Sequence, residues 1–217
     1  MENIVNNGNK TIIRPIQSSH DDVSQQSVNN CINIAKFNAL NKQLHNNCCN
    51  VNCPIANNTN SKCIANGSFN AKIMFIDAFP SQYETFTGCM TDEKGYLFEE
   101  ALSHTKVKRS DIYCTTVLKC SDVSSVNESI VMNCLKCYLQ KEVNLIKPEK
   151  VILTYSAFQA LLKYQVIPYT GQINYFNKFH CTMFNGIEVD AYVIYDINQL
   201  NKDQRQTFKQ GLQFILQ

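Results

Sequence analysis

The chain of 217 residues lacks any apolar run of the roughly 18 residues that a membrane-spanning helix requires. Its polar N-terminus also lacks the charged and then apolar layout of a secretory signal peptide. It contains no internal repeat, and its net charge is only +2. These absences favour an intracellular protein of the cytoplasm, nucleoid or nucleus, with no membrane partner. A nearly neutral chain neither requires nor excludes a nucleic acid partner, because local patches of charge decide such binding.

Cysteine, by contrast, is abundant. The chain has eleven cysteines, and four of them lie in the asparagine-rich stretch 46–63, NNCCNVNCPIANNTNSKC. Thiols inside a cell are mostly kept reduced, and an odd number cannot pair completely, so a disulfide framework is disfavoured. An iron–sulphur cluster or a zinc ion would each take four thiolates. The remaining interpretation, small core residues, suits Cys31, Cys89, Cys114 and Cys181.

Hydrophobic patterning predicts alternating strands and helices from residue 71 onwards. Strands are predicted at 71–79, 111–120 and 150–155, and helices at 96–104, 127–146, 156–164 and 202–217. Ser156 is the expected N-cap of its helix. The Asn185-Gly186 pair predicts a hairpin within 174–197. A shorter helix is predicted at 28–44, after a polar arm at residues 1–25.

This alternation predicts an α/β fold in which helices cover both faces of a mainly parallel sheet. We expect residues 26–217 to form one domain. In such sheets ligands bind at the carboxyl ends of the strands. Three segments follow those ends, at 77–88, 118–122 and 195–200.

The ordered motifs AKIMFIDAFPSQYETFTG, DIYCTTVLKC and NCLKCYLQKEVNLIKPEKVILTYSAFQALL follow a pair of closely spaced cysteines. This set resembles the iron–sulphur class of uracil-DNA glycosylases, including related domains associated with phage DNA polymerases. The resemblance runs roughly from Cys48 to the C-terminus. It implies a three-layer sandwich with a central, mainly parallel, four-stranded sheet. It also implies DNA as a partner, including single-stranded DNA, together with a replication or repair protein.

The resemblance further implies one 4Fe-4S cluster held by four cysteines. By position, Cys53 is the second ligand and Cys120 the third, and the fourth is Cys134 or Cys137. The first is Cys48 or Cys49, because the gap to Cys53 is one residue longer than the family's spacing. We therefore expect the following ligand set, with zinc as the alternative metal: Cys49, Cys53, Cys120 and Cys134.

The catalytic half of the family pattern is altered. The family uses a Gly-Glu-Ala-Pro-Gly-like loop after the first strand, an asparagine on the second strand that reads uracil, and a histidine that stabilises the departing uracil anion. Here Pro80 is retained, but Ala78 stands at the glutamate position and Asp77 precedes it. Thr116 takes the asparagine position, and Asp196 takes that of the histidine. An ionised carboxylate cannot donate a hydrogen bond to an anion.

Two hypotheses follow. In the first, the protein is a glycosylase with altered or weak base excision, in which Asp77, Asp196 or Glu84 activates water. In the second, it is a catalytically inactive accessory protein that binds DNA or a polymerase and keeps the fold and the cluster. The expected substrate-binding residues are Ala78, Phe79, Pro80, Thr116 and Asn198.

Further residues suggest contact with DNA. The aromatic residues Phe79, Tyr83 and Phe86 either stack on a flipped base or pack within their own loop. A DNA-binding face near the cluster is predicted from five basic residues: Lys106, Lys108, Arg109, Lys119 and Lys136.

Overall fold

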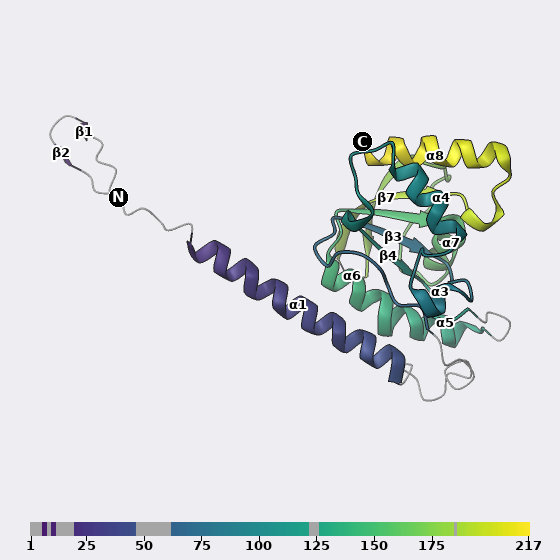
Figure 1. Ribbon diagram of the computed structural model, residues 1–217, viewed down its shortest axis with the longest axis horizontal. Coiled ribbons are helices and arrows are strands. Elements are labelled where there is room, and N and C mark those ends of the chain that lie inside the picture. Colours follow the sequence, from purple (N-terminus) through teal and green to yellow (C-terminus); the bar gives the residue numbers. More distant parts are fainter. Residues whose placement is uncertain (1–5, 8–9, 12–19, 47–61, 122–125, 185) are drawn as a thin grey trace.

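The computed structural model describes residues 6–7, 10–11, 20–46, 62–121, 126–184 and 186–217. Its centre is a five-stranded sheet in the order β4-β3-β5-β7-β6, with helices on both of its faces (Figure 1). The strands are β3 (Ile73–Asp77), β4 (Ile112–Thr116), β5 (Lys150–Thr154), β6 (Lys178–Met183) and β7 (Ile187–Ile194). A separate two-stranded sheet pairs β1 (Asn6–Asn7) with β2 (Lys10–Thr11).

The expected α/β fold with a mainly parallel sheet is confirmed. Strands β4, β3, β5 and β7 are mutually parallel, and β6 pairs antiparallel with β7 at the edge. The sheet therefore has five strands and not the expected four, because the hairpin contributes both of its arms. Gly186, with φ of 116°, lies in the turn of this hairpin, in a conformation that glycine adopts without strain.

Seven helices of the described part carry the labels of Figure 1. They are α1 (His20–Asn46), α3 (Glu84–Thr87), α4 (Glu93–Leu102), α5 (Glu128–Cys134), α6 (Gln140–Ile146), α7 (Tyr155–Lys163) and α8 (Lys202–Leu216). Short turns at η1 (Arg109–Asp111), η2 (Leu135–Leu139) and η3 (Ile197–Gln199) complete the elements. Within the described residues, no helix is both long and apolar enough to cross a membrane.

Alternation along the strands divides the core into two layers. Met74 and Ile76 of β3 join an apolar cluster with residues of α1, α5, α6 and α7, whereas Phe75 joins a second cluster with residues of α4 and α8. Successive side chains of a strand point to opposite faces, so a strand that is buried on both faces reads as a continuous apolar run. That is why the run at 71–79 predicted this strand.

Two helix starts show how local chemistry sets the element boundaries. Helix α8 begins after Asn201, whose side chain accepts a hydrogen bond from Gln204 N at 2.9 Å in a capping box. The expected N-cap Ser156 is wrong, because Thr154 caps α7 and its Oγ1 accepts from Ala157 N. Ser156 lies inside the first turn of that helix.

Two predicted helices differ in extent from their expected ranges. The helix predicted at 127–146 forms, but the π-helical turn η2 divides it into α5 and α6. Helix α1 is longer than the predicted 28–44, and its N-terminal half extends away from the sheet (Figure 1). Its buried residues Phe37, Leu40 and Leu44 belong to the cluster on the α5–α7 side.

Candidate active site at the carboxyl ends of the strands

Three polar side chains end neighbouring strands on the α4 side of the sheet. Asp77 of β3 pairs in register with Thr116 of β4. Thr154, the last residue of β5, donates from Oγ1 to Asp77 Oδ1 at 3.0 Å. Thr116 Oγ1 is buried and has no hydrogen-bond partner among the described residues. The carboxyl edge of the sheet, where α/β proteins bind their ligands, is therefore polar and centred on Asp77.

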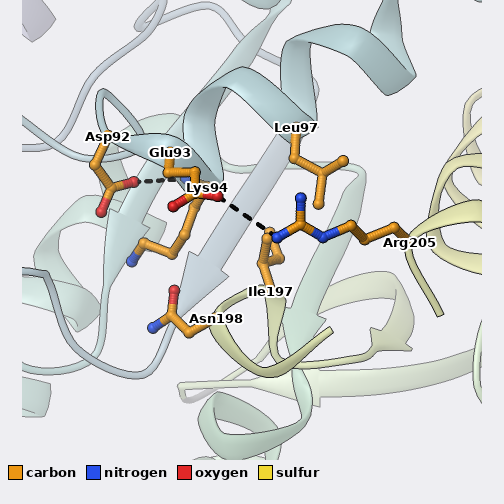
Figure 2. A pocket seen from close by; sticks show the side chains of 7 residues that line it. All are labelled: Asp92, Glu93, Lys94, Leu97, Ile197, Asn198 and Arg205. Carbon is orange, nitrogen blue, oxygen red and sulfur yellow. Dashed lines mark hydrogen bonds and ion pairs between the residues drawn. The ribbon is translucent and has the colours of Figure 1, made fainter. Parts of the chain in front are cut away.

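A cavity of about 260 Å³ lies on this side, and we call it the polar pocket. Figure 2 shows its lining residues: Asp92, Glu93, Lys94, Leu97, Ile197, Asn198 and Arg205. Lys94 comes from the first turn of α4, and Asn198 comes from η3, which follows β7. Asn198, expected to bind substrate, thus shares a cavity with a lysine that itself contacts Asp77.

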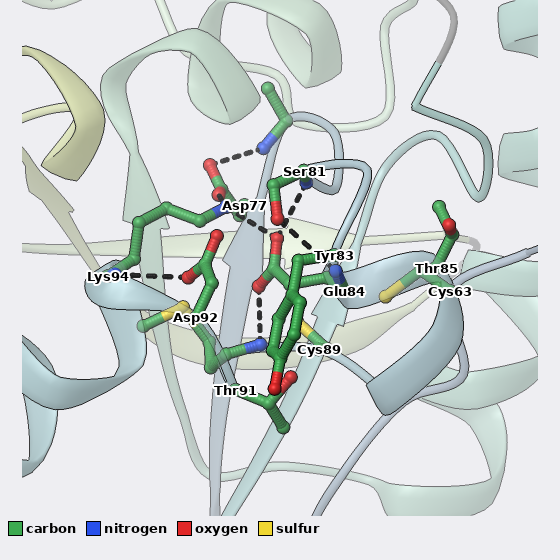
Figure 3. Close-up of polar contacts among 12 residues, drawn as sticks. Cys63, Asp77, Ser81, Tyr83, Glu84, Thr85, Cys89, Thr91, Asp92 and Lys94 are labelled. Atoms are coloured by element: carbon green, nitrogen blue, oxygen red, sulfur yellow. Dashed lines mark hydrogen bonds and ion pairs between the residues drawn. The ribbon is translucent and has the colours of Figure 1, made fainter.

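Lys94 forms a buried ion-pair network, which Figure 3 shows in detail. Its Nζ lies 2.8 Å from Asp77 Oδ2 and 2.7 Å from Glu84 Oε2. Burial lowers the pKa of Lys94, but the charges of Asp77 and Glu84 outweigh it, and the pKa is raised overall. Lys94 is therefore an ammonium ion, and the three groups carry one net negative charge when both carboxylates are ionised.

Every oxygen of these two carboxylates has a partner. Asp77 Oδ1 accepts from Ala78 N at 2.8 Å as well as from Thr154, while Oδ2 accepts from Lys94. Glu84 Oε2 accepts from Ser81 N at 2.8 Å in addition to Lys94. Glu84 Oε1 accepts from Met90 N. The network joins the end of β3 to α3 and α4, so it fixes the geometry of the loop between them.

Local sequence signals explain how the loop forms. Ser81 and Glu84 have the spacing of a capping box, and Glu84 N donates to Ser81 Oγ at 3.2 Å. Asp92 caps α4 by accepting from Lys94 N at 3.0 Å, which sets Lys94 in the first helical turn. Sequence reasoning did not identify Lys94 as a site residue. The Ser81–Glu84 spacing is a signal for the turn, but the ion pair depends on tertiary structure.

Two of the other expected substrate-binding residues, Ala78 and Phe79, line a hollow on the opposite face. An apolar pocket of about 400 Å³ is lined by Ala78, Phe79, Val117, Leu118, Val131, Ser156, Gln159, Ala160, Lys163 and Tyr164. Ala78 and Phe79 therefore line a different hollow from Asn198, and Pro80 is buried between the exposed Phe79 and the half-buried Ser81. The structure does not bring all the expected substrate-binding residues into one pocket.

Asp196 is held by α7. Its Oδ1 accepts from Ser156 N at 2.9 Å, and its Oδ2 accepts from Ser156 Oγ at 2.7 Å. An acidic side chain at the start of a helix satisfies unpaired backbone N–H groups and interacts favourably with the helix dipole. Asp77 and Asp196, the two expected catalytic carboxylates, thus bind different helices at the same edge of the sheet.

Two of the expected cluster ligands lie in the described part. Cys120 and Cys134 are buried in the same apolar cluster, and Cys137 packs against it. None of the three forms a disulfide. The candidates Cys48, Cys49 and Cys53 lie outside the described residues, and within the described ones no group of three or more histidine, cysteine or acidic side chains is placed to hold a metal. Two buried thiols in apolar surroundings are compatible with half of a four-thiolate site.

Two sequence expectations about single residues are wrong. Lys119 does not lie on a DNA-binding face, because it is fully buried and its Nζ pairs with Glu142 Oε2 at 2.9 Å. Cys31 is exposed on α1 and is not a core residue. The other three cysteines expected in the core, Cys89, Cys114 and Cys181, are buried.

Fold and geometry together describe an α/β protein with a polar pocket at the carboxyl edge of a mainly parallel sheet. Residues 64–213 match the family model of the uracil DNA glycosylase superfamily. The match spans every strand of the large sheet and well over half of the chain, so the chain belongs to this superfamily. No curated protein is similar enough to count as a match.

Proposed function

We propose that this protein acts on DNA inside the cell as a uracil-DNA glycosylase-like hydrolase with altered or weak base excision, in repair or replication. Membership of the superfamily supports a DNA substrate. The observation that carries the proposal is the Asp77–Lys94–Glu84 network at the strand ends. Enzymes that excise a base flip it into a pocket, where charged groups must act on the base, the sugar and a water molecule.

The network bears on both parts of glycosidic hydrolysis, the departure of the base and the attack of water on the sugar. The C–N bond breaks with its electron pair on the base, the oxygen of water adds to the sugar carbon, and a carboxylate takes the proton of that water. Asp77 is the expected base, but its oxygens already accept from Ala78 N, Thr154 and Lys94. The Lys94 ammonium lies beside the polar pocket and would stabilise an anionic base on departure. The engagement of the Asp77 oxygens supports altered or weak base excision.

We infer that the protein also holds a 4Fe-4S cluster through Cys49, Cys53, Cys120 and Cys134, with Cys48 and Cys137 as alternatives. The burial of Cys120 and Cys134 in one apolar cluster supports this inference. A cluster would supply a covalent link between the segment that holds Cys49 and Cys53, the segment after β4 and helix α5. Zinc is the alternative ion, since it also takes four thiolates.

An excision assay on single- and double-stranded DNA containing uracil or other modified bases tests the activity. We expect slow excision by the anaerobically purified protein, and Asp77→Asn should reduce the rate by about 100-fold or more, as loss of a general base does. Asp190→Asn is the matched control. Asp190 is partly exposed and lies opposite Lys150, the first residue of β5, so it is at the other end of the strands from Asp77. Equal rates for the native protein and Asp77→Asn would refute the assigned role of Asp77.

The second candidate function is an inactive accessory protein that binds DNA or a polymerase. It is favoured by the structural engagement of both expected carboxylates, Asp77 with Lys94 and Asp196 with Ser156. Absence of excision on every base tested, together with DNA binding, would establish this function in place of the first. Excision that disappears in Asp77→Asn would exclude it.

A further inference from the structure

The turn after β3 presents large aromatic side chains to solvent. Phe79 is 38% exposed, Tyr83 59% and Phe86 72%. The loop therefore does not pack its aromatic residues within itself. Exposed aromatic groups beside a ligand site indicate an interaction surface more often than isolated exposed residues do.

Tyr83 and Phe86 lie on one side of a single helical turn. Tyr83 has helical backbone angles, with φ of −65° and ψ of −44°, and Phe86 N donates to Tyr83 O at 3.0 Å. Residues three apart in a helix are neighbours on its surface. The two rings are thus presented as a pair at the carboxyl edge of the sheet, where β3 ends.

The turn that carries the pair is held rigidly. Glu84 lies between the two aromatic residues in sequence, and its buried carboxylate accepts from Ser81 N, Met90 N and Lys94 Nζ. Figure 3 shows Tyr83 on the same turn as this carboxylate. A surface fixed in this way loses little conformational entropy when a ligand binds.

The turn presents no exposed negative charge to solvent. Glu84 is the only acidic residue between Phe79 and Thr87, and it is fully buried and paired with Lys94. The exposed residues beside the rings, Gln82 and Thr87, are neutral. No exposed carboxylate of this turn would repel the phosphates of a bound strand.

We propose that Tyr83 and Phe86 form a stacking surface for unpaired bases of single-stranded DNA, next to the carboxyl-end site. The inference rests on the proposed function, which makes DNA the partner, and it adds the form of DNA and the residues that hold it. Every base has a flat face, so such a surface supplies affinity without sequence preference. It would hold the part of the strand that flanks the nucleotide on which the site acts.

The absence of tryptophan allows a direct spectroscopic test. In Phe86→Trp of the full chain, a single tryptophan replaces one ring of the pair, and addition of an oligothymidine should quench its fluorescence by stacking. Phe214→Trp is the matched control. Phe214 is 66% exposed, and its neighbour Ile215 accepts a hydrogen bond from Lys150 at the start of β5, so it lies at the opposite edge of the sheet.

Binding constants complete the test. Tyr83→Ala and Phe86→Ala should each weaken oligothymidine binding by roughly tenfold, with an unchanged salt dependence, because stacking releases no counterions. Phe214→Ala should bind like the native protein. These side chains are exposed, so their removal should leave the free energy of unfolding unchanged.

Two outcomes overturn the inference in distinguishable ways. Native-like binding by the double variant Tyr83→Ala/Phe86→Ala, or equally tight binding of a strand without bases, would overturn the stacking surface and leave the proposed action on DNA standing. No binding of any DNA by the native protein would overturn both.

Discussion

At the scale of single residues, buried charge distinguishes this protein. Lys94 joins Asp77 and Glu84, and Lys119 joins Glu142, so two lysines are buried near the carboxyl ends of β3 and β4. A buried ion is tolerated only when it is paired and hydrogen-bonded. Sequence reasoning took Lys119 for a surface residue because an isolated lysine is usually solvated. Its partner Glu142 is 23 positions away, which no local pattern reveals.

Removal of the Lys94 charge should be costly. Lys94→Met leaves two buried carboxylates without their cation, and we expect a loss of about 3–5 kcal/mol in the free energy of unfolding. The measurement is urea denaturation at neutral pH, followed by circular dichroism. Lys72→Met is the control, because Lys72 pairs with Glu149 on the surface, where solvent screens the ion pair and its contribution to stability is small. Equal free energies of unfolding for Lys94→Met and Lys72→Met would show that Lys94 does not form a buried ion pair.

At the scale of elements, periodicity predicted the strands well and the helix boundaries less well. The runs at 71–79 and 150–155 are buried on both faces and are continuous in sequence, so they could be recognised directly. Thr154 and Ser156 are both good capping residues, and only the direction of the chain on leaving β5 selects Thr154. The long helix α1 crosses the boundary expected at residues 25 and 26, and the extent of the domain stays a prediction.

Helix α1 lies entirely before residues 64–213, which match the family model. Its packing on the sheet domain can therefore be tested separately. Leu44 is 2% exposed in the α5–α7 cluster, and Leu44→Ala should lower the free energy of unfolding by about 2–5 kcal/mol. Ile32→Ala, on the exposed part of the same helix, should change it by less than about 0.5 kcal/mol. If Leu44→Ala were equally mild, α1 would not be docked on the sheet domain in solution.

At the scale of the whole molecule, the fold brings distant segments to one edge of the sheet. Asp77, Lys94 and Thr154 come from separate elements and meet in one network, while Asn198 reaches the polar pocket from beyond β7. The proposed cluster would depend on the same property, because Cys49 and Cys53 are far in sequence from Cys120 and Cys134. The odd number of cysteines and the reducing interior of a cell favoured a metal site. The ligand set, however, came from the resemblance to the iron–sulphur class of uracil-DNA glycosylases.

Metal analysis checks the cluster. We expect anaerobically purified protein to show broad visible absorption and to contain about four iron and four sulphide ions per chain. Cys120→Ser should lose both, and a comparison of Cys134→Ser with Cys137→Ser identifies the fourth ligand. Cys31→Ser, at an exposed position of α1, should retain the colour. A colourless protein that contains zinc would contradict the cluster and support the alternative ion.

The sequence by itself determined the α/β class, the positions of the parallel strands, the hairpin at Gly186 and the importance of the segment after β3. These features follow from short-range rules, in which burial sets periodicity and turn chemistry sets the breaks. Tertiary structure alone decided that Asp77 is paired with Lys94, that Ala78 and Asn198 face different pockets, and that Tyr83 and Phe86 stand exposed. Pairing and exposure depend on which elements pack together, and packing joins residues that no local pattern connects.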